Sequence, residues 1–180
     1  MAEWYRRSAE KIMTFDKRDT REGAWIKCPK CTTVLYHKQL ERNNHVCTSC
    51  AHHFRMNSDH YINLLFGGES FEEIGAEIRP SDPLEFNASK SYKDQVAASG
   101  EKTGLTEAVR AVKGNLNGLP VVICIMDFSF IGGSIGSVVG ERISRAIDIA
   151  RKENRSLVIF TSSGGARMQE GALSLMQMAK

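Results

Sequence analysis

The second half of the chain has the apolar pattern of strands that alternate with helices. Residues 119–127 are apolar at nearly every position, which predicts a strand buried on both faces. Residues 106–115 predict its hairpin partner, because Asn117-Gly118 between them is a dipeptide favoured in two-residue turns. Residues 157–161 predict a third strand, also buried.

Helices are predicted after the second and third of these strands. Apolar side chains recur at helical spacing from Val139 to Ala150, with charged residues opposite, and Asn154 closes this helix. A last helix starts near Arg167 or Glu170. The order is therefore β-β-α-β-α, an α/β unit with a glycine-rich turn at each strand-to-helix corner.

The segment before this unit is less regular. Pro80 and Pro83 interrupt it, and it carries no sharp chemical motif. We expect residues 57–105 to be a connector that packs on a core domain of residues 106–180. Its predicted pieces are a helix from Asn57 or Ser58 through Leu65 that ends at Gly67-Gly68, a strand or irregular piece at 71–78, a helix at 89–98 and a loop at 99–104.

Composition places the 180 residues among globular proteins. The chain is 42% hydrophobic and 25% charged, which excludes wholesale disorder and fibrous repeats. Its longest apolar run, residues 121–126, is far shorter than the roughly 18–20 residues of a bilayer span. Residues 1–24 predict a helical or flexible segment without the apolar region of a signal peptide. We therefore expect a cytoplasmic protein with no membrane partner.

Charge and metal-binding residue types concentrate in the first third. Residues 1–60 hold 11 Lys/Arg and 7 Asp/Glu, a local charge of +4, whereas residues 61–180 hold 13 and 14. All five histidines and four of the five cysteines also lie before residue 61. This distribution predicts a separate metal-binding module at residues 25–56, with a solvated basic surface or an anionic partner.

Four cysteines form the most specific motif in the chain. Cys28 and Cys31 make one C-x2-C pair, and Cys47 and Cys50 make a second pair fifteen residues later. Two such turns present four thiolates at tetrahedral corners, the arrangement that Zn²⁺ prefers. A closed four-thiolate shell leaves no open position, so we predict one structural zinc per chain. Val34-Leu35-Tyr36 and residues 41–46 supply strand material between the pairs.

Alternatives exist for these residue types. Disulfides are the alternative for the four cysteines, but a cytosolic chain keeps its thiols reduced. His52 and His53 could replace a cysteine ligand, although the thiolate set is complete without them. The fifth cysteine, Cys124, lies in an apolar run and is predicted to be a small buried hydrophobic residue.

Two glycine tracts precede the predicted helices of the core domain. Gly132-Gly133-Ser134 and Gly164-Gly165-Ala166 either satisfy backbone geometry or expose N–H groups that bind an anion or oxyanion. Neither tract matches a dinucleotide, Walker or hydrolase motif. Ser162 or Ser163 as a nucleophile would lack a histidine partner, because no histidine follows His60. The spacing alone leaves both interpretations of the glycines open.

The two cysteine pairs occur together with residues 128–140 (FSFIGGSIGSVVG) and residues 160–180 (FTSSGGARMQEGALSLMQMAK). This combination closely resembles the carboxyltransferase β subunit of bacterial and plastid acetyl-CoA carboxylase, from about Trp25 to Lys180. The resemblance implies a zinc ribbon followed by a crotonase-like (ClpP/crotonase) domain, a superhelix of β-β-α turns. It also implies a site built from backbone amides of Gly164 and Gly165, with Gly132 and Gly133 in support.

The same resemblance implies a reaction and partners. The enzyme moves a carboxyl group from carboxybiotin, on biotin carboxyl carrier protein, to acetyl-CoA, giving malonyl-CoA for fatty acid synthesis. The β subunit works with an α subunit as an α2β2 heterotetramer, and with biotin carboxylase in a larger complex. Lys180 falls inside an amphipathic helix, whereas family members run on, so we expect a truncated crotonase-like domain whose activity alone is left open.

A nucleic-acid-binding zinc ribbon is the alternative function. The local charge of +4 and five basic or imidazole side chains could contact phosphates. These are Arg42, His45, His52, His53 and Arg55. Such binding could also coexist with the enzymatic role.

Overall fold

The computed structural model describes residues 24–180, which form two compact units, the first ending at Arg55 and the second beginning at Met56. The predicted N-terminal segment, residues 1–24, lies almost wholly outside the described residues. None of the described helices is long and apolar enough to cross a bilayer.

The first unit is a small ribbon around the cysteines. Strands β1 (Trp25–Lys27) and β2 (Val34–Tyr36) pair antiparallel, and the helix α1 (His37–Arg42) follows directly. The prediction of strand material at residues 41–46 was wrong, because the chain turns into α1 and only Val46 forms a bridge, to His53. Leu35 and Leu40 are buried beside Cys28 and Cys47, so the apolar core of this unit is built around the cysteines.

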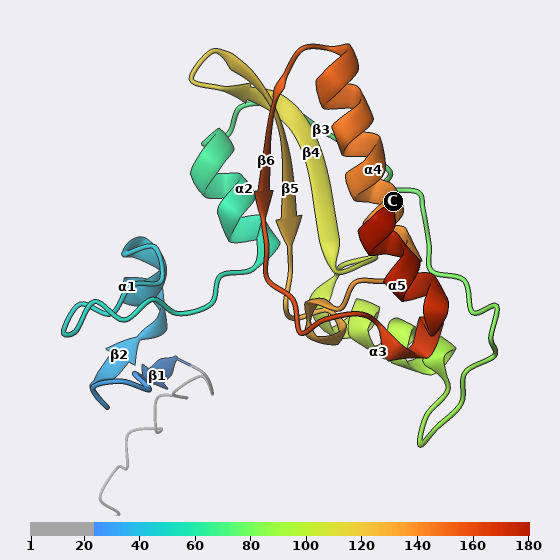
Figure 1. The fold of residues 1–180 in the computed structure, drawn as a ribbon. Helices are drawn as coiled ribbons and strands as arrows, with labels where there is room; N and C mark the ends of the chain where they lie inside the picture. The colour runs from blue at the N-terminus through green and yellow to red at the C-terminus, as the bar shows by residue number, and fades with distance from the viewer. Residues whose placement is uncertain (1–23) are drawn as a thin grey trace, which may run out of the picture. The chain divides into compact units, whose positions relative to one another are not determined.

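The second unit is built on a four-stranded sheet in the order β3-β4-β5-β6 (Figure 1). β4 (Val109–Leu116) and β5 (Leu119–Met126) form the predicted hairpin, with Asn117 and Gly118 both at positive φ in its turn. β3 (Phe71–Glu73) adds antiparallel to β4. β6 (Ser156–Phe160) returns parallel to β5 after a helix, as the β-β-α-β pattern predicts.

The strand β5 divides two hydrophobic clusters because its side chains alternate between the sheet faces. Val122, Cys124 and Met126 pack on one face with the helix α4 (Ser137–Lys152), and the residues between them pack on the other face with α2 (Ser58–Phe66). Figure 1 shows these two helices on opposite sides of the sheet. The prediction that this strand is buried on both faces is confirmed.

The third predicted strand is less buried than expected. Leu157, Val158 and Ile159 are 37%, 40% and 38% exposed, so the prediction of a buried strand was wrong. Within the described residues β6 pairs only with β5 and forms an edge of the sheet. An apolar run alone cannot distinguish an edge strand from a central one.

The remaining helices lie toward the lower end of the sheet in Figure 1. The helix α3 (Tyr92–Thr103) begins after the cap Ser91 and continues through Gly100 to Gly104, so the predicted loop at 99–104 was wrong. A single interior glycine costs about 1 kcal/mol in a helix, which the other contacts of α3 can offset. The short 3-10 helix η1 (Ile131–Gly133) lies between β5 and α4, and the 3-10 helix η2 (Met168–Glu170) and the helix α5 (Ala172–Ala179) follow β6.

Candidate functional sites: a four-cysteine cluster and two paired glycine loops

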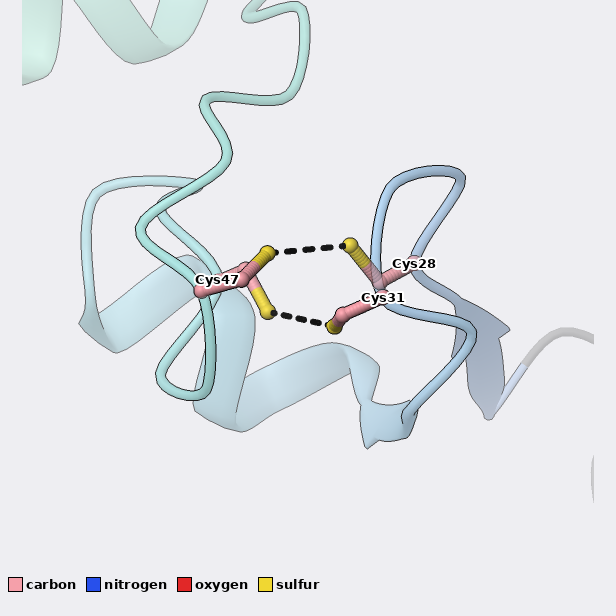
Figure 2. A group of neighbouring side chains, drawn as sticks. Cys28, Cys31 and Cys47 are labelled. Atoms are coloured by element: carbon pink, nitrogen blue, oxygen red, sulfur yellow. Dashed lines mark hydrogen bonds between the residues drawn. The ribbon is translucent and has the colours of Figure 1, made fainter.

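The four predicted metal ligands lie together. The sulfur atoms of Cys28, Cys31, Cys47 and Cys50 are all within 4.8 Å of one another. The Cys28–Cys50 and Cys31–Cys47 sulfur pairs are each 3.7 Å apart. Figure 2 shows the labelled cysteines, from both turns, directed into one gap. Zinc–sulfur bonds of about 2.3 Å in a tetrahedron place neighbouring sulfurs about 3.8 Å apart, so the cluster fits one zinc ion.

Each cysteine pair is held by the same backbone turn. In the first, the Cys28 N–H donates to the Thr33 carbonyl and the Thr32 N–H donates to the Cys28 carbonyl, both at 2.9 Å. In the second, the Cys47 N–H donates to the His52 carbonyl at 2.8 Å and the Ala51 N–H to the Cys47 carbonyl at 3.0 Å. Thr32 and Ala51 occupy the equivalent positions at positive φ. The two halves of the site are therefore alike in local geometry as well as in spacing.

Hydrogen bonding and burial act differently on the individual thiols. Hydrogen bonds with Thr33 lower the pKa of Cys31 to about 6, whereas burial raises the pKa of Cys50 to about 12. A bound cation would favour the thiolate at both positions. Burial also raises the pKa of Cys124, in β5, to about 12, which agrees with its predicted role as a neutral core residue.

The histidines of the ribbon stand outside the sulfur cluster. The described residues that could hold a metal ion are the four cysteines, without His52 or His53. His45 is buried, so the prediction that it contacts phosphates was wrong. The other four side chains of that prediction, those of Arg42, His52, His53 and Arg55, are exposed or half-buried.

The two glycine tracts lie side by side in the second unit. We call residues 131–136 the first glycine loop and residues 161–167 the second glycine loop. The Gly164 N–H donates to the Gly132 carbonyl at 2.9 Å, and the Ile135 N–H donates to the Gly165 carbonyl at 2.8 Å. Ile135 and Ala166 form a parallel bridge. The four predicted glycines are therefore brought together at one place, although 30 residues separate the tracts.

The four glycines divide into two kinds. A Cβ on Gly133 would lie 2.2 Å from the Ser162 carbonyl oxygen, and one on Gly164 would lie 3.3 Å from the Gly132 oxygen. These two positions therefore let the loops approach each other. Gly132 and Gly165 have φ values of +64° and +126°, and a Cβ on either would meet nothing within 4 Å. These two glycines border open space.

The backbone N–H groups of the four glycines differ in availability. Those of Gly133 and Gly164 donate to backbone carbonyls, at Phe130 and Gly132. That of Gly165 donates to the Ser163 hydroxyl at 3.0 Å, which a stronger acceptor could replace. The structure gives the Gly132 N–H no hydrogen-bond partner among the described residues. Gly132 and Gly165 are therefore the candidates for binding an oxyanion, whereas the N–H of Gly164 is used between the loops.

A buried polar network that contacts the glycine loops was not predicted. Arg167, Glu107, Tyr92 and Glu170 are all fully or almost fully buried. Arg167 forms an ion pair with Glu107, and the Tyr92 hydroxyl donates to Glu170 at 2.7 Å. Arg167 and Glu170 belong to the tract that carries the family resemblance, but no local pattern indicates that either side chain points inward.

Burial, hydrogen bonds and neighbouring charges shift the pKa values of Arg167 and Tyr92. Burial opposes the charge of Arg167, but hydrogen bonds and the charge of Glu107 outweigh it and raise the pKa of the guanidinium. Burial raises the pKa of Tyr92 above its ordinary range, so its hydroxyl remains a donor at neutral pH. Arg167 and Tyr92 therefore keep their protons at neutral pH and act as hydrogen-bond donors.

Two family models match the chain, one in each compact unit. The acetyl-CoA carboxylase zinc finger domain matches residues 25–50. The carboxyl transferase domain matches residues 81–180, which include both glycine loops.

Curated relatives match nearly the whole chain. The acetyl-coenzyme A carboxylase carboxyl transferase subunit beta of Chlorobaculum parvum is 49% identical over 177 residues, and that of Chlorobium luteolum is 50% identical over the same length. Each alignment covers 98% of this chain and 63% of the relative. The chain therefore spans less than two thirds of the length of these relatives.

Solved structures resemble this chain in fold. Transcarboxylase 12S, solved with methylmalonyl-coenzyme A and methylmalonic acid bound, matches with a TM-score of 0.55 at 25% identity, over 69% of this chain and 22% of that chain. The β subunit of P. aeruginosa geranyl-CoA carboxylase matches with a TM-score of 0.51 at 17% identity, over 79% and 22%. These neighbours have the crotonase fold, so the predicted fold class, a four-cysteine ribbon followed by a crotonase-like unit, is confirmed.

Proposed function

The chain belongs to the carboxyl transferase family, and from this premise we propose that it is the β-subunit part of an acetyl-CoA carboxylase carboxyltransferase. The proposed reaction transfers the carboxyl group of carboxybiotin to acetyl-CoA and gives malonyl-CoA. The carboxyl transferase match supports this function over the nucleic-acid alternative, because it lies in the unit that carries the glycine loops and not in the ribbon.

This reaction needs stabilisation of two developing negative charges. Removal of the methyl proton from the thioester creates an enolate, whose oxygen gains charge. Cleavage of the carboxyl C–N bond releases CO2 and leaves a ureido anion on biotin, which takes the methyl proton. The enolate carbon then forms the new C–C bond with CO2. The proton thus moves between the two substrates, and the protein need only orient them and stabilise their oxygens.

The paired glycine loops are the observation that carries the proposal. Gly132 and Gly165 have positive φ values and border open space. Their two backbone N–H groups are the ones that could donate hydrogen bonds to an oxyanion. A backbone donor of this kind contributes about 3–4 kcal/mol to transition-state stabilisation without a titrating side chain. The absence of histidine from residues 61–180 is consistent with such a site.

The four-cysteine ribbon is proposed to hold one structural zinc ion. Its sulfur separations match the edge of a zinc tetrathiolate, and all four positions would be filled by protein. When bound, the ion would fix the two turns relative to each other. Cys28, Cys31, Cys47 and Cys50 therefore act in folding of the ribbon, and we assign them no role in carboxyl transfer.

The proposed partners follow from the reaction and the family. They are the carboxyltransferase α subunit in an α2β2 heterotetramer, biotin carboxyl carrier protein as the donor and biotin carboxylase in the larger complex. We propose that the assembly works in the cytoplasm, where acetyl-CoA is consumed for fatty acid synthesis.

The proposal is tested with the complete β subunit assembled with its α subunit. Malonyl-CoA and free biotin are supplied, and acetyl-CoA formation is followed in the reverse direction. We expect activity that depends on biotin and on both subunits. A properly assembled complex that converts no malonyl-CoA in the presence of biotin would contradict the proposed function.

A further inference from the structure

All hydrogen-bond donors of the Arg167 guanidinium are paired with acceptors within the protein. Its Nε donates to the Ser134 hydroxyl at 3.0 Å, and its Nη2 donates to the Ser134 carbonyl at 2.9 Å and to Glu107. Its Nη1 donates to the Tyr92 hydroxyl and to the other Glu107 oxygen, both at 2.9 Å. All five N–H groups of the side chain therefore have an acceptor.

These bonds join the two glycine loops. Arg167 ends the second glycine loop, and Ser134 lies in the middle of the first, two residues after Gly132. The backbone N–H of Arg167 also donates to the Ile135 carbonyl at 2.9 Å. Arg167 thus donates hydrogen bonds to three polar groups of the first glycine loop: the hydroxyl and the carbonyl of Ser134 and the carbonyl of Ile135.

The network continues to the helix that follows the first loop. The Tyr92 hydroxyl, which accepts from Arg167, donates to one oxygen of Glu170 at 2.7 Å. The other Glu170 oxygen accepts from the Ser137 N–H at 2.6 Å, at the first residue of α4. A carboxylate is favoured at a helix N-terminus, so Glu170 anchors the far end of the same loop.

Stability alone is a weak explanation for these groups. Removing a buried ion pair from water is costly, and well-packed hydrophobic residues often stabilise a protein equally well or better. The pair instead fixes geometry, because Arg167 presents a planar donor set to atoms of one loop while Glu107 balances its charge. The loop that it fixes carries the Gly132 N–H.

We infer that Arg167 is a positioning residue for carboxyl transfer, which holds the two glycine loops in the register that their oxyanion-binding amides require. The inference rests on the proposed function. Arg167 does not touch substrate in this arrangement, because all of its donors bind protein groups. Tyr92 and Glu107 assist by fixing the guanidinium.

The test compares two buried arginines in the complete β subunit assembled with its α subunit. R167K keeps the charge but cannot make the five bonds. R142K is the matched control, because Arg142 is also almost fully buried yet donates to Val109, Ile78 and Thr106, none of which belongs to either loop. We expect R167K to lower kcat about a hundredfold with little change in KM for acetyl-CoA, because a misplacement near 1 Å has that effect. R142K should melt earlier but keep kcat within about twofold per folded molecule.

Two further measurements separate this inference from the proposed function. Amide hydrogen exchange over residues 130–136 should be faster in R167K than in R142K, whatever reaction the complex catalyses. If R167K does not fold, Y92F takes its place, with an expected kcat loss of about tenfold, because this variant loses the hydrogen bonds of the Tyr92 hydroxyl with Arg167 and Glu170. A folded R167K or Y92F with normal kcat, or with unchanged loop exchange, overturns the inference. An inactive wild-type complex refutes the proposed function, and loop exchange then decides whether Arg167 positions the loops.

Discussion

At the scale of residues, adjacent glycines in one loop have different physical reasons to be glycine. Gly132 and Gly133 both hold a positive φ, +64° and +66°, but only Gly133 also lacks room for a side chain. The sequence motif marked both as candidates for the site, and it could not separate them. The separation depends on Ser162, which is 29 residues away in sequence and reaches Gly133 only in the folded unit.

Gly133→Ala should therefore destabilise the second unit more than Gly132→Ala. The new methyl group on residue 133 would overlap the Ser162 carbonyl and force the loops apart, at an expected cost of about 1–3 kcal/mol in unfolding free energy beyond the cost of the positive φ that both positions share. Gly132→Ala should cost about 1 kcal/mol for its positive φ alone. Urea unfolding of both variants measures the difference, and equal losses would show that the loops do not pack as described.

Gly165→Val should reduce catalysis more than stability. Its side chain would enter open space, but a branched residue disfavours a φ of +126° and would move the N–H that we assign to the oxyanion. We expect kcat for carboxyl transfer to fall about a hundredfold or more, with a smaller change in acyl-CoA affinity.

Gly118→Val is the matched control for that substitution. Gly118 also has a positive φ and open space, in the hairpin turn between β4 and β5. It should melt earlier but retain its turnover per folded molecule. The same behaviour in Gly165→Val would assign Gly165 to architecture.

At the scale of elements, local patterns predicted the hairpin and the helices of the second unit better than they predicted which strand lies at the edge of the sheet. Asn117-Gly118 set the β4–β5 register through its own backbone preference, and the apolar stripe from Val139 predicted α4. The helix α3 passes through Gly100 because its C-terminal cap is Gly104, four residues later. Which strand ends the sheet depends on pairing across the whole unit, and no single segment encodes it.

The link between β5 and α2 is another long-range feature that local patterns did not predict. Asp127, just after β5, accepts from the N–H and hydroxyl of Ser58 at 2.7 and 2.9 Å, and from Ser129 through the other oxygen. Burial opposes the charge, but these four hydrogen bonds outweigh it and lower the pKa of the carboxyl. The Asp127 carboxylate thus links the first residue of α2 to the end of β5 by hydrogen bonds.

Asp127→Asn should weaken this link in a pH-dependent way. A folded-state pKa below the unfolded value of about 4 means that the ionised group stabilises the fold above pH 4 and loses this effect as the pH falls through the folded value. We expect a loss of about 1–3 kcal/mol at pH 7 and a narrowing difference from wild type below pH 4. Urea titrations across pH measure this, with the exposed Asp148→Asn as control; a constant difference would contradict it.

At the scale of the whole molecule, the two compact units use different means of stabilisation. The second unit has two hydrophobic clusters on opposite faces of a sheet. The ribbon has a small core whose fully buried members include Cys28 and Cys47 themselves. Spacing alone predicted the complete set of four cysteines, because each C-x2-C turn is a local structure. The buried Arg167 network was not predicted, because its four members come from three separated segments of the chain.

Zinc loss should accordingly unfold one unit and spare the other. We expect one zinc per chain, and Cys47→Ser should lose the metal together with the ribbon fold, because binding contributes on the order of 10 kcal/mol. Cys124→Ser, at a cysteine outside the cluster, should retain full zinc content. Metal analysis and hydrogen exchange across residues 56–180 test both points, and retained zinc in Cys47→Ser would refute the ligand set.

The exposed strand β6 has a consequence for the behaviour of the 180-residue chain in solution. Among residues 24–180 no strand pairs with its outer edge, which carries apolar side chains on both faces, and such an edge can pair with a strand of another molecule. Light scattering from concentrated samples should therefore rise with time and concentration. A lysine in place of Val158, which is 40% exposed, should improve colloidal stability while leaving the zinc ribbon intact.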